Sequence, residues 1–148
     1  MAAFIGVAQI SEEALTTAAE TVVQIVAAAN QRVKVLGFGV FFDGISPTAE
    51  PIQVELCRQS TAGTSSALTP VKWDDSLAET LTTTARQDFT AEPTTGDVIW
   101  SGEVHPQGSY ECQYALGQEP ICGGADRIGI RCTAPVAVNV RAYIRFEE

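Results

Sequence analysis

Side chains able to do acid–base or nucleophilic chemistry are few in this chain of 148 residues. His105 is the one histidine, and it stands in the sequence Val-His-Pro-Gln-Gly, where proline and glycine favour a surface turn. A catalytic site needs an acid, a base or a nucleophile converging on one point, and a lone turn histidine supplies one such group. We therefore predict a surface histidine here rather than a catalytic base.

The segment at residues 63–67, Gly-Thr-Ser-Ser-Ala, is a near match to the nucleophile elbow of hydrolases, with alanine in place of the last glycine. The elbow requires a strand, a sharp turn and a helix, whereas this segment lies in a run of serine and threonine. We predict no catalytic residue and no enzyme activity. A small hydrolase with acids clustered near His105 or Ser65 is the alternative that remains open.

Adjacent acids occur at residues 74–75 and 147–148. Neither pair has the spacing of an EF-hand loop, and neighbours on a strand point to opposite faces, so we expect solvated carboxylates. The glycines at positions 37, 39, 123 and 124 lack the further glycines and the following helix of a phosphate loop. We predict neither a metal site nor a cofactor.

Four cysteines lack the spacing of a zinc site: Cys57, Cys112, Cys122 and Cys132. No Cys-x-x-Cys motif is present, and one histidine cannot complete the usual Cys/His ligand sets. We expect free thiols that pack as small apolar side chains. A disulfide between Cys112 and Cys122 across a turn is the alternative in an oxidising environment.

The net charge of −9 limits the partners of this protein. Long-range attraction to nucleic acid or to an anionic membrane surface is not expected of an acidic chain. No segment approaches the roughly 18 consecutive apolar residues of a membrane-spanning helix. The first residues lack the basic region of a secretory signal peptide, and acids follow soon after, so we expect synthesis in a cytoplasm.

Short runs rich in Val, Ile, Phe, Tyr and Thr follow one another from residue 21 onward, separated by Gly, Pro, Asp and Ser. This punctuation is typical of an all-β protein. The candidate strands are residues 21–28, 32–42, 52–59, 79–84, 97–104, 110–114, 127–133 and 136–146. We predict an antiparallel β-sandwich of about eight strands, jelly-roll-like, over residues 21–148.

The candidate strand at residues 32–42 differs from the others because it is apolar on both faces. A strand covered on both sides implies a second sheet or a neighbouring subunit. Its two glycines, Gly37 and Gly39, indicate a bend or a close approach of another group.

Residues 1–20 lack this pattern, and the first ten carry no charged side chain. We expect an extended N-terminal arm, separate from the sandwich, with a reach on the order of 65 Å when fully extended. A frayed terminus is the alternative. Apolar residues of the arm that could dock on a partner are Phe4, Ile5, Val7 and Ile10.

The C-terminal segment, residues 127–148, is basic: four arginines and two glutamates give +2, so the preceding 126 residues carry −11. Within each of the last two candidate strands the arginines are four residues apart and share a face. If these strands form a hairpin, one face gathers Arg127, Arg131, Arg141, Tyr143 and Arg145. Arginine and tyrosine are favoured at interfaces, so this stripe is a candidate subunit interface. The alternative is a solvated face balanced by carboxylates of the same chain.

The same C-terminal residues carry a resemblance. The sequences Arg-Ile-Gly-Ile-Arg-Cys-Thr-Ala-Pro at residues 127–135 and Val-Asn-Val-Arg-Ala-Tyr-Ile-Arg-Phe-Glu-Glu at residues 138–148 resemble the ending of small structural proteins encoded in tailed-bacteriophage genomes. The resemblance extends to residues 51–56, 61–66 and 104–108.

This resemblance implies a non-enzymatic virion component, a capsid decoration (cement) protein that looks like a jelly roll and trimerises over the phage head. The implied partners are further copies of the chain and the major capsid protein, and the implied location is the capsid surface of the virion. An arm that docks on the capsid is typical of such proteins, and residues 1–20 are the candidate for it.

Aromatic residues leave a second functional class open. Two tryptophans and three tyrosines could form a platform for sugar rings or pack in the core and at sheet edges: Trp73, Trp100, Tyr110, Tyr114 and Tyr143. A platform would favour a carbohydrate- or receptor-binding β-sandwich module of a phage tail or fibre.

Overall fold

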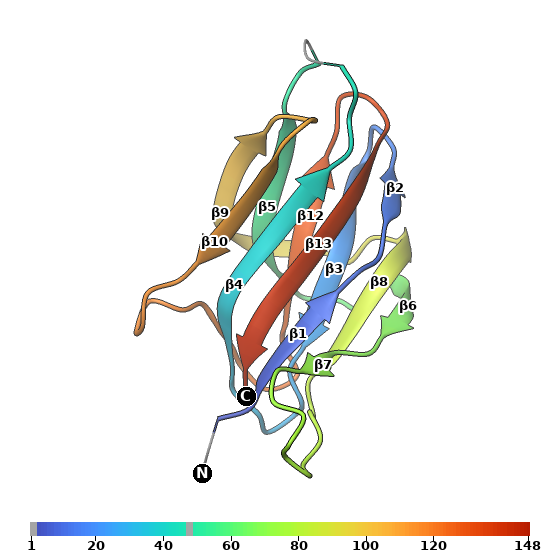
Figure 1. Ribbon diagram of the computed structural model, residues 1–148. Helices are drawn as coiled ribbons and strands as arrows, with labels where there is room; N and C mark the ends of the chain where they lie inside the picture. The colour runs from blue at the N-terminus through green and yellow to red at the C-terminus, as the bar shows by residue number, and fades with distance from the viewer. Residues whose placement is uncertain (1–2, 47–48) are drawn as a thin grey trace.

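The computed structural model describes residues 3–46 and 49–148, which form two antiparallel sheets packed face to face (Figure 1). The front sheet of Figure 1 contains, in spatial order, β10 (Ser109–Gln113), β4 (Val33–Phe42), β13 (Val138–Glu147), β1 (Ile5–Gln9) and β7 (Val71–Lys72). Two short strands join it, β11 (Ile121–Cys122) beside β4 and β2 (Glu13–Leu15) beside β13. The back sheet contains β6 (Thr64–Leu68), β8 (Thr84–Ala91), β3 (Ala19–Val26), β12 (Arg127–Thr133), β5 (Ile52–Gln59) and β9 (Thr95–Val104).

The core lies between the two sheets and is filled from both by alternate residues of each strand. On β13 the inward side chains include Ile144 and Phe146, and on β12 they include Ile128 and Ile130, all fully buried. Period-two alternation produces this because successive side chains of a strand point to opposite faces. The predicted all-β sandwich is therefore confirmed.

Seven of the eight predicted strands correspond to strands of the structure, within a few residues at their ends. The exception is residues 79–84, which are irregular except for Thr84 at the start of β8. The described residues form thirteen strands rather than about eight. Sequence reasoning missed six strands, which are either short or mostly polar and exposed and therefore show little apolar alternation: β1, β2, β6, β7, β8 and β11.

The predicted C-terminal hairpin is wrong. Strand β12 pairs with β3 and β5 in the back sheet, whereas β13 pairs with β4 and β1 in the front sheet. The connection at residues 134–137 therefore passes from one sheet to the other. Alternation defines which face of a strand is buried, but the neighbours of a strand are chosen by contacts distant in sequence.

The predicted separate arm is also wrong for the described part of residues 1–20. Strand β1 lies between β13 and β7, and β2 lies beside β13. Ala8 and Ile10 are buried in the core, and Phe4 exchanges backbone hydrogen bonds with Glu148 at 3.1 and 2.9 Å. Without β1, the long strand β13 would leave a row of backbone groups unpaired. Residues 1 and 2 lie outside the described part.

Candidate interaction surface

The outer face of the front sheet, called here the front face, consists of the side chains of β10, β4, β13 and β1 that point away from the core, together with Val71 and Trp73. The register aligns them in rows across the sheet: Tyr143 lies opposite Gly39 and Gln9, and Arg145 lies opposite Gly37 and Val7. Val71 is 63 % and Trp73 is 65 % exposed. The front face therefore presents apolar and aromatic groups to solvent from several neighbouring strands.

Gly39 of β4 makes room for Tyr143. A Cβ placed on Gly39 would lie 2.5 Å from Cε1 of the Tyr143 ring, so the ring occupies the space of the missing side chain. The Tyr143 hydroxyl donates a hydrogen bond of 2.8 Å to the Glu111 carboxylate on β10, and the ring stacks against Phe41 with centroids 6.3 Å apart. Burial and the Glu111 carboxylate raise the pKa of Tyr143 to about 12. The contact of the Tyr143 ring with Gly39 is thus a close approach of the kind predicted for this strand.

Arg145 lies on the front face beside Trp73. Its guanidinium carbon lies 5.6 Å from the ring centroid of Trp73, a cation–π contact. A hollow of about 360 Å³ opens beside this pair, between the sheet and the β10–β11 loop. Its lining mixes apolar, aromatic and polar side chains: Ile5, Leu36, Trp73, Gln113, Tyr114, Leu116, Glu119 and Arg145.

Arg141 also lies on the front face, but in an exposed ion pair. Its guanidinium is 3.4 Å from the carboxylate of Glu12, and both side chains are largely in solvent. A pair of this kind contributes little to stability because water screens both charges. Arg141 is therefore available to a partner.

The other two arginines of the predicted stripe lie on the back sheet. Arg131 is ion-paired with Glu55, with Nε 2.9 Å from a carboxylate oxygen, and it donates a 3.0 Å hydrogen bond to Thr95. Glu55 is 9 % exposed, so this pair is mostly closed to solvent. Arg127 donates to the backbone oxygen of Ala125 at 3.5 Å. The single stripe is wrong, because β12 and β13 belong to different sheets and their outer faces point in opposite directions.

The four docking residues predicted in the arm differ in their burial and position. Ile5 and Val7 are half-buried on β1, opposite Glu147 and Arg145, and belong to the front face. Phe4 is half-buried just before β1. Ile10 is 3 % exposed in the core and is closed to any partner. Strand pairing thus brings Ile5 and Val7 to the same surface as Tyr143 and Arg145.

The cysteines are all free, and the register excludes the predicted alternative of a Cys112–Cys122 disulfide. Cys112 lies opposite Phe38 on β4, whereas Cys122 lies opposite Val33. Five residues along a strand span roughly 16 Å, far more than the Cα separation of a disulfide. Burial raises the pKa of Cys57 to about 11 and also raises that of Cys132.

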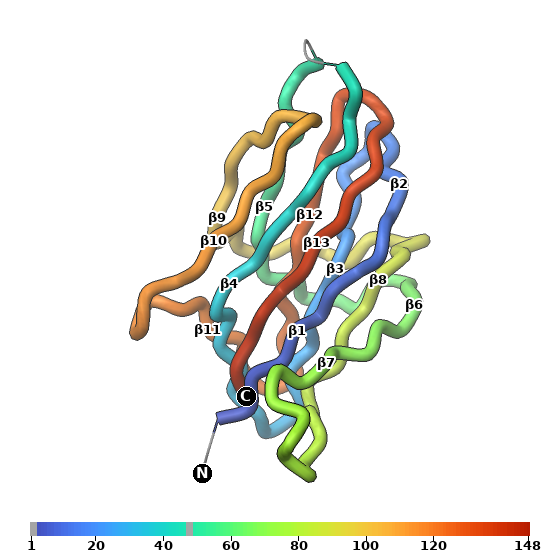
Figure 2. The backbone as a smooth tube through the Cα atoms, in the orientation of Figure 1, coloured from blue at the N-terminus to red at the C-terminus, as the bar shows by residue number. Residues whose placement is uncertain are grey.

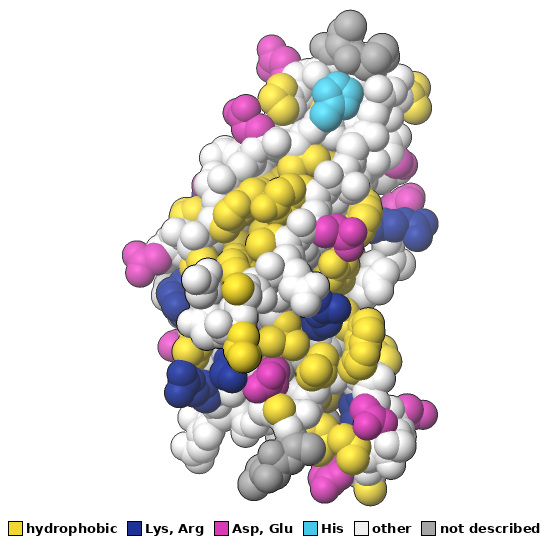
Figure 3. All heavy atoms as spheres, turned by 60° about the vertical axis from the view of Figure 1, so that its left-hand side comes forward, with side chains coloured by type: hydrophobic (Ala, Val, Ile, Leu, Met, Phe, Trp, Pro, Cys, Tyr) yellow, Lys and Arg dark blue, Asp and Glu magenta, His cyan; other side chains and the backbone are white. Residues whose placement is uncertain are grey.

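The aromatic residues do not form one platform. Trp100 on β9 and Tyr110 on β10 stack with ring centroids 4.6 Å apart, and both lie against Phe38 of the core. They close the gap between the two sheets on the side where β9 and β10 form the edges, where Figure 3 shows hydrophobic side chains gathered together. Trp73 and Tyr143 lie instead on the front face.

His105 lies in the connection between β9 and β10, whereas Ser65 lies on β6. In residues 3–46 and 49–148, no set of three or more His, Cys, Asp or Glu side chains is placed to hold a metal ion. The His105 Nδ1 accepts a 3.1 Å hydrogen bond from the backbone of Gln107, within its own turn. In the same ranges no helix has the length and apolar character required to cross a membrane.

Members of the front face that sequence reasoning missed include Phe41, Val71 and Glu111. Alternation within β4 could have assigned Phe41 to the face of Gly37 and Gly39, whereas Glu111 joins this face only through the pairing of β10 with β4. Val71 belongs to a strand of two residues, which leaves no periodic signal.

Comparison with protein-family models, with curated proteins and with solved structures gave no match to this chain.

Proposed function

We propose that this chain is a non-enzymatic structural protein of a tailed-bacteriophage virion, a capsid decoration (cement) protein that sits on the head as a homotrimer and stabilises the shell. In this proposal the protein is made in the host cytoplasm and binds the major capsid protein on the outer surface of the head. The C-terminal resemblance suggests this role, and the geometry of the front face supports it.

The observation that carries the proposal is the composition of the front face. Val71 and Trp73 are mostly exposed, and Ile5 and Val7 lie beside them at half burial. An exposed apolar patch of this kind, beside polar and charged side chains of the same sheet face, favours contact with another protein. Tyr143 and Arg145 are residue types enriched where proteins meet, and both are held in place by neighbours.

We infer a jelly-roll arrangement from the strand order. Eight of the strands follow it when they are numbered from one to eight along the chain: β1, β3, β4, β5, β9, β10, β12 and β13. They then pair as 6-3-8-1 in the front sheet and 2-7-4-5 in the back sheet, an order that fits two interleaved Greek keys. Of the remaining strands, β7 extends the front sheet beyond β1, β8 and β6 extend the back sheet beyond β3, and β11 and β2 pair with β4 and β13.

The test is binding to phage heads assembled from the major capsid protein of a tailed phage. We expect the purified protein to sediment with the heads and to raise the temperature at which they rupture. The double variant Val71→Asp with Trp73→Asp should stay in the supernatant, because two carboxylates would be buried unpaired in the contact. Val98→Asp, a change at an exposed apolar residue of the back sheet, is the matched control and should bind like wild type.

Two outcomes contradict the proposal. If wild-type protein remains in the supernatant at concentrations well above those of the capsid sites, the capsid role is wrong. If the Asp variant at positions 71 and 73 binds as wild type does, the front face is not the docking surface. Circular dichroism of both variants separates loss of binding from loss of fold.

A second function is favoured by one feature, the hollow beside Trp73. An aromatic ring next to polar side chains such as Gln113 and Glu119 is a combination that sugar-binding sites use. The protein would then be a carbohydrate- or receptor-binding module of a tail or fibre. A glycan array distinguishes the two: specific binding that Trp73→Ala abolishes supports this second function, and an array without hits opposes it.

A further inference from the structure

We propose that copies of this chain join edge to edge, with the β10–β11 loop of one copy inserted into an apolar groove at the opposite edge of the next. The loop places Leu116 in the groove. This inference rests on the proposed homo-oligomer and names the two surfaces through which it assembles.

The loop is an ordered turn that holds one apolar side chain in solvent. Leu116 is 92 % exposed at its tip. The backbone N–H of Gln118 donates to the oxygen of Ala115 at 3.0 Å, and the N–H of Gly117 donates to the Glu119 carboxylate at 2.6 Å. Gly117 has a φ of +86°, a conformation that suits glycine and turns the chain sharply. These bonds present Leu116 in a defined position, as a contact residue requires.

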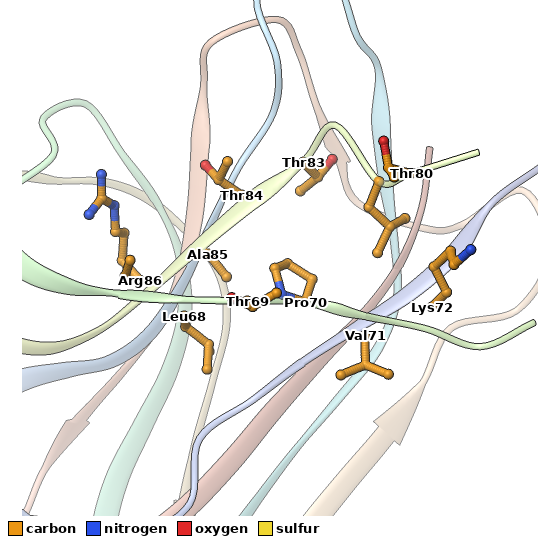
Figure 4. A pocket seen from close by; sticks show the side chains of 12 residues that line it. Leu68, Thr69, Pro70, Val71, Lys72, Thr80, Thr83, Thr84, Ala85 and Arg86 are labelled. Atoms are coloured by element: carbon orange, nitrogen blue, oxygen red, sulfur yellow. The ribbon is translucent and has the colours of Figure 1, made fainter. Parts of the chain in front are cut away.

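The groove lies where the connection between β6 and β7 passes from the back sheet to the front sheet, facing residues 80–86 (Figure 4). Its volume is about 580 Å³. Most of the lining surface is apolar and comes from six residues: Ala67, Leu68, Pro70, Val71, Leu81 and Ala85. An open apolar groove of this size accommodates a leucine side chain and the turn that carries it.

Two polar side chains of the groove lining, Lys72 and Thr83, differ in their hydrogen bonding. The Lys72 ammonium donates to the backbone oxygens of Leu77 and Glu79, the latter at 3.1 Å, and so ties down the segment beside the groove. The Thr83 hydroxyl is buried and has no hydrogen-bond partner within the described ranges.

The charges of the two surfaces are complementary. The groove lining contains two cations, Lys72 and Arg86, and no carboxylate. The loop at residues 114–120 contains one charged side chain, the carboxylate of Glu119. A second copy therefore meets the groove with the opposite charge, which fixes the orientation of the contact and favours it over other apolar segments.

The positions of loop and groove determine the symmetry. Strands β10 and β7 are the opposite edges of the front sheet, and Figure 2 shows the β10–β11 loop protruding on the side away from β6 and β7. Each copy thus carries both halves of the contact on different surfaces. Such a heterologous contact joins copies head to tail. It closes into a ring, here the proposed trimer, when the rotations from one copy to the next add up to a full turn.

The test uses two variants that each lack one half of the contact. Leu116→Asp lacks the loop contact but keeps the groove. Ala67→Trp combined with Arg86→Glu blocks and recharges the groove but keeps the loop, and both positions are exposed enough to tolerate change. In sedimentation velocity we expect wild type to form a ring and each variant to be monomeric, with association weakened at least about tenfold. An equimolar mixture of the two should form a 1:1 dimer, because one intact contact is restored.

The control is Ile45→Asp, since Ile45 is also 92 % exposed but lies in the loop after β4. It should sediment as wild type does. The inference is overturned if Leu116→Asp keeps the wild-type size, if the mixed variants do not pair, or if native mass spectrometry finds a small molecule that occupies the groove of wild type and is lost in the blocked variant. Because Val71 lines both the groove and the front face, the two claims are separated by Trp73→Asp alone, a front-face change outside the groove lining: it should lose binding to phage heads and still form the ring.

Discussion

Tyr143 on β13 occupies the space that a side chain at position 39 would fill: its Cε1 atom lies 2.5 Å from where the Cβ of residue 39 would be. Gly39 is opposite Tyr143 in the register, and the phenol reaches across β4 to the Glu111 carboxylate on β10. One glycine thus allows three strands of the front sheet to be linked by a single side chain.

Replacing Gly39 with alanine should destabilise the protein by about 1–3 kcal/mol, because the new methyl group displaces the Tyr143 ring and breaks its bond to Glu111. Chemical denaturation measures the change in the free energy of unfolding. Gly96→Ala is the control, since a Cβ at Gly96 would have its nearest neighbour at 3.4 Å. In a Tyr143→Ala background the Gly39→Ala change should cost much less, and equal costs in both backgrounds would contradict the steric explanation.

Glu13 should make stability fall as pH rises. Burial, and then the negative charges of Asp88, Glu20 and Glu92, raise the pKa of Glu13 in the folded protein from 4.5 to about 7. The folded state therefore holds this proton more tightly than the unfolded state. Its contribution to stability is complete below pH 4.5 and is lost as pH rises through about 7.

The variant Glu13→Gln isolates this effect, because it keeps the shape of the protonated acid and cannot ionise. Above pH 7 it should melt at a higher temperature than wild type, and below pH 4.5 the two should melt together. Glu50→Gln changes an exposed carboxylate and serves as the control. A difference between Glu13→Gln and wild type that does not change with pH would show that the carboxyl does not titrate in this range.

The two ion-paired arginines should differ sharply in their effect on stability. Arg131→Ala leaves Glu55 charged, mostly buried and without its partner, at a cost of about 3 kcal/mol. Arg141→Ala removes an exposed pair with Glu12 and should cost less than about 1 kcal/mol. Replacing Arg131 and Glu55 together by leucine should restore most of the loss. Equal costs for the two alanine variants, measured by urea denaturation, would contradict this assignment.

Thiol labelling should separate the cysteines by burial. Cys57, Cys122 and Cys132 are buried in the fold and burial raises the pKa of each, so their thiols stay protonated and closed to reagents near pH 8. Cys112 is half-buried on an edge strand. A disulfide-forming aromatic reagent should therefore label at most this one thiol in the native protein and all four in guanidinium. The variant Cys112→Ser should abolish native labelling, and mass spectrometry after mild oxidation should find no Cys112–Cys122 bridge.

Alternation in the sequence was sufficient to predict the strands that contribute most to the core. In β12 and β13 every second residue is apolar, and these residues are the ones that the sandwich buries. The same reasoning failed for residues 79–84, where threonines gave the composition of a strand without a regular apolar face. It also passed over β1, because five residues with two small inward side chains, Gly6 and Ala8, give a weak pattern.

Residue types and period-two spacing along single strands were enough to predict the all-β class and the buried faces of the long strands. The tertiary structure decided which strands are neighbours. It placed Arg131 and Arg145 on opposite sides of the sandwich and brought Ile5 beside Trp73. The physical reason is that a strand specifies its own faces locally, whereas its partners depend on the crossing connections and on packing of side chains from distant segments.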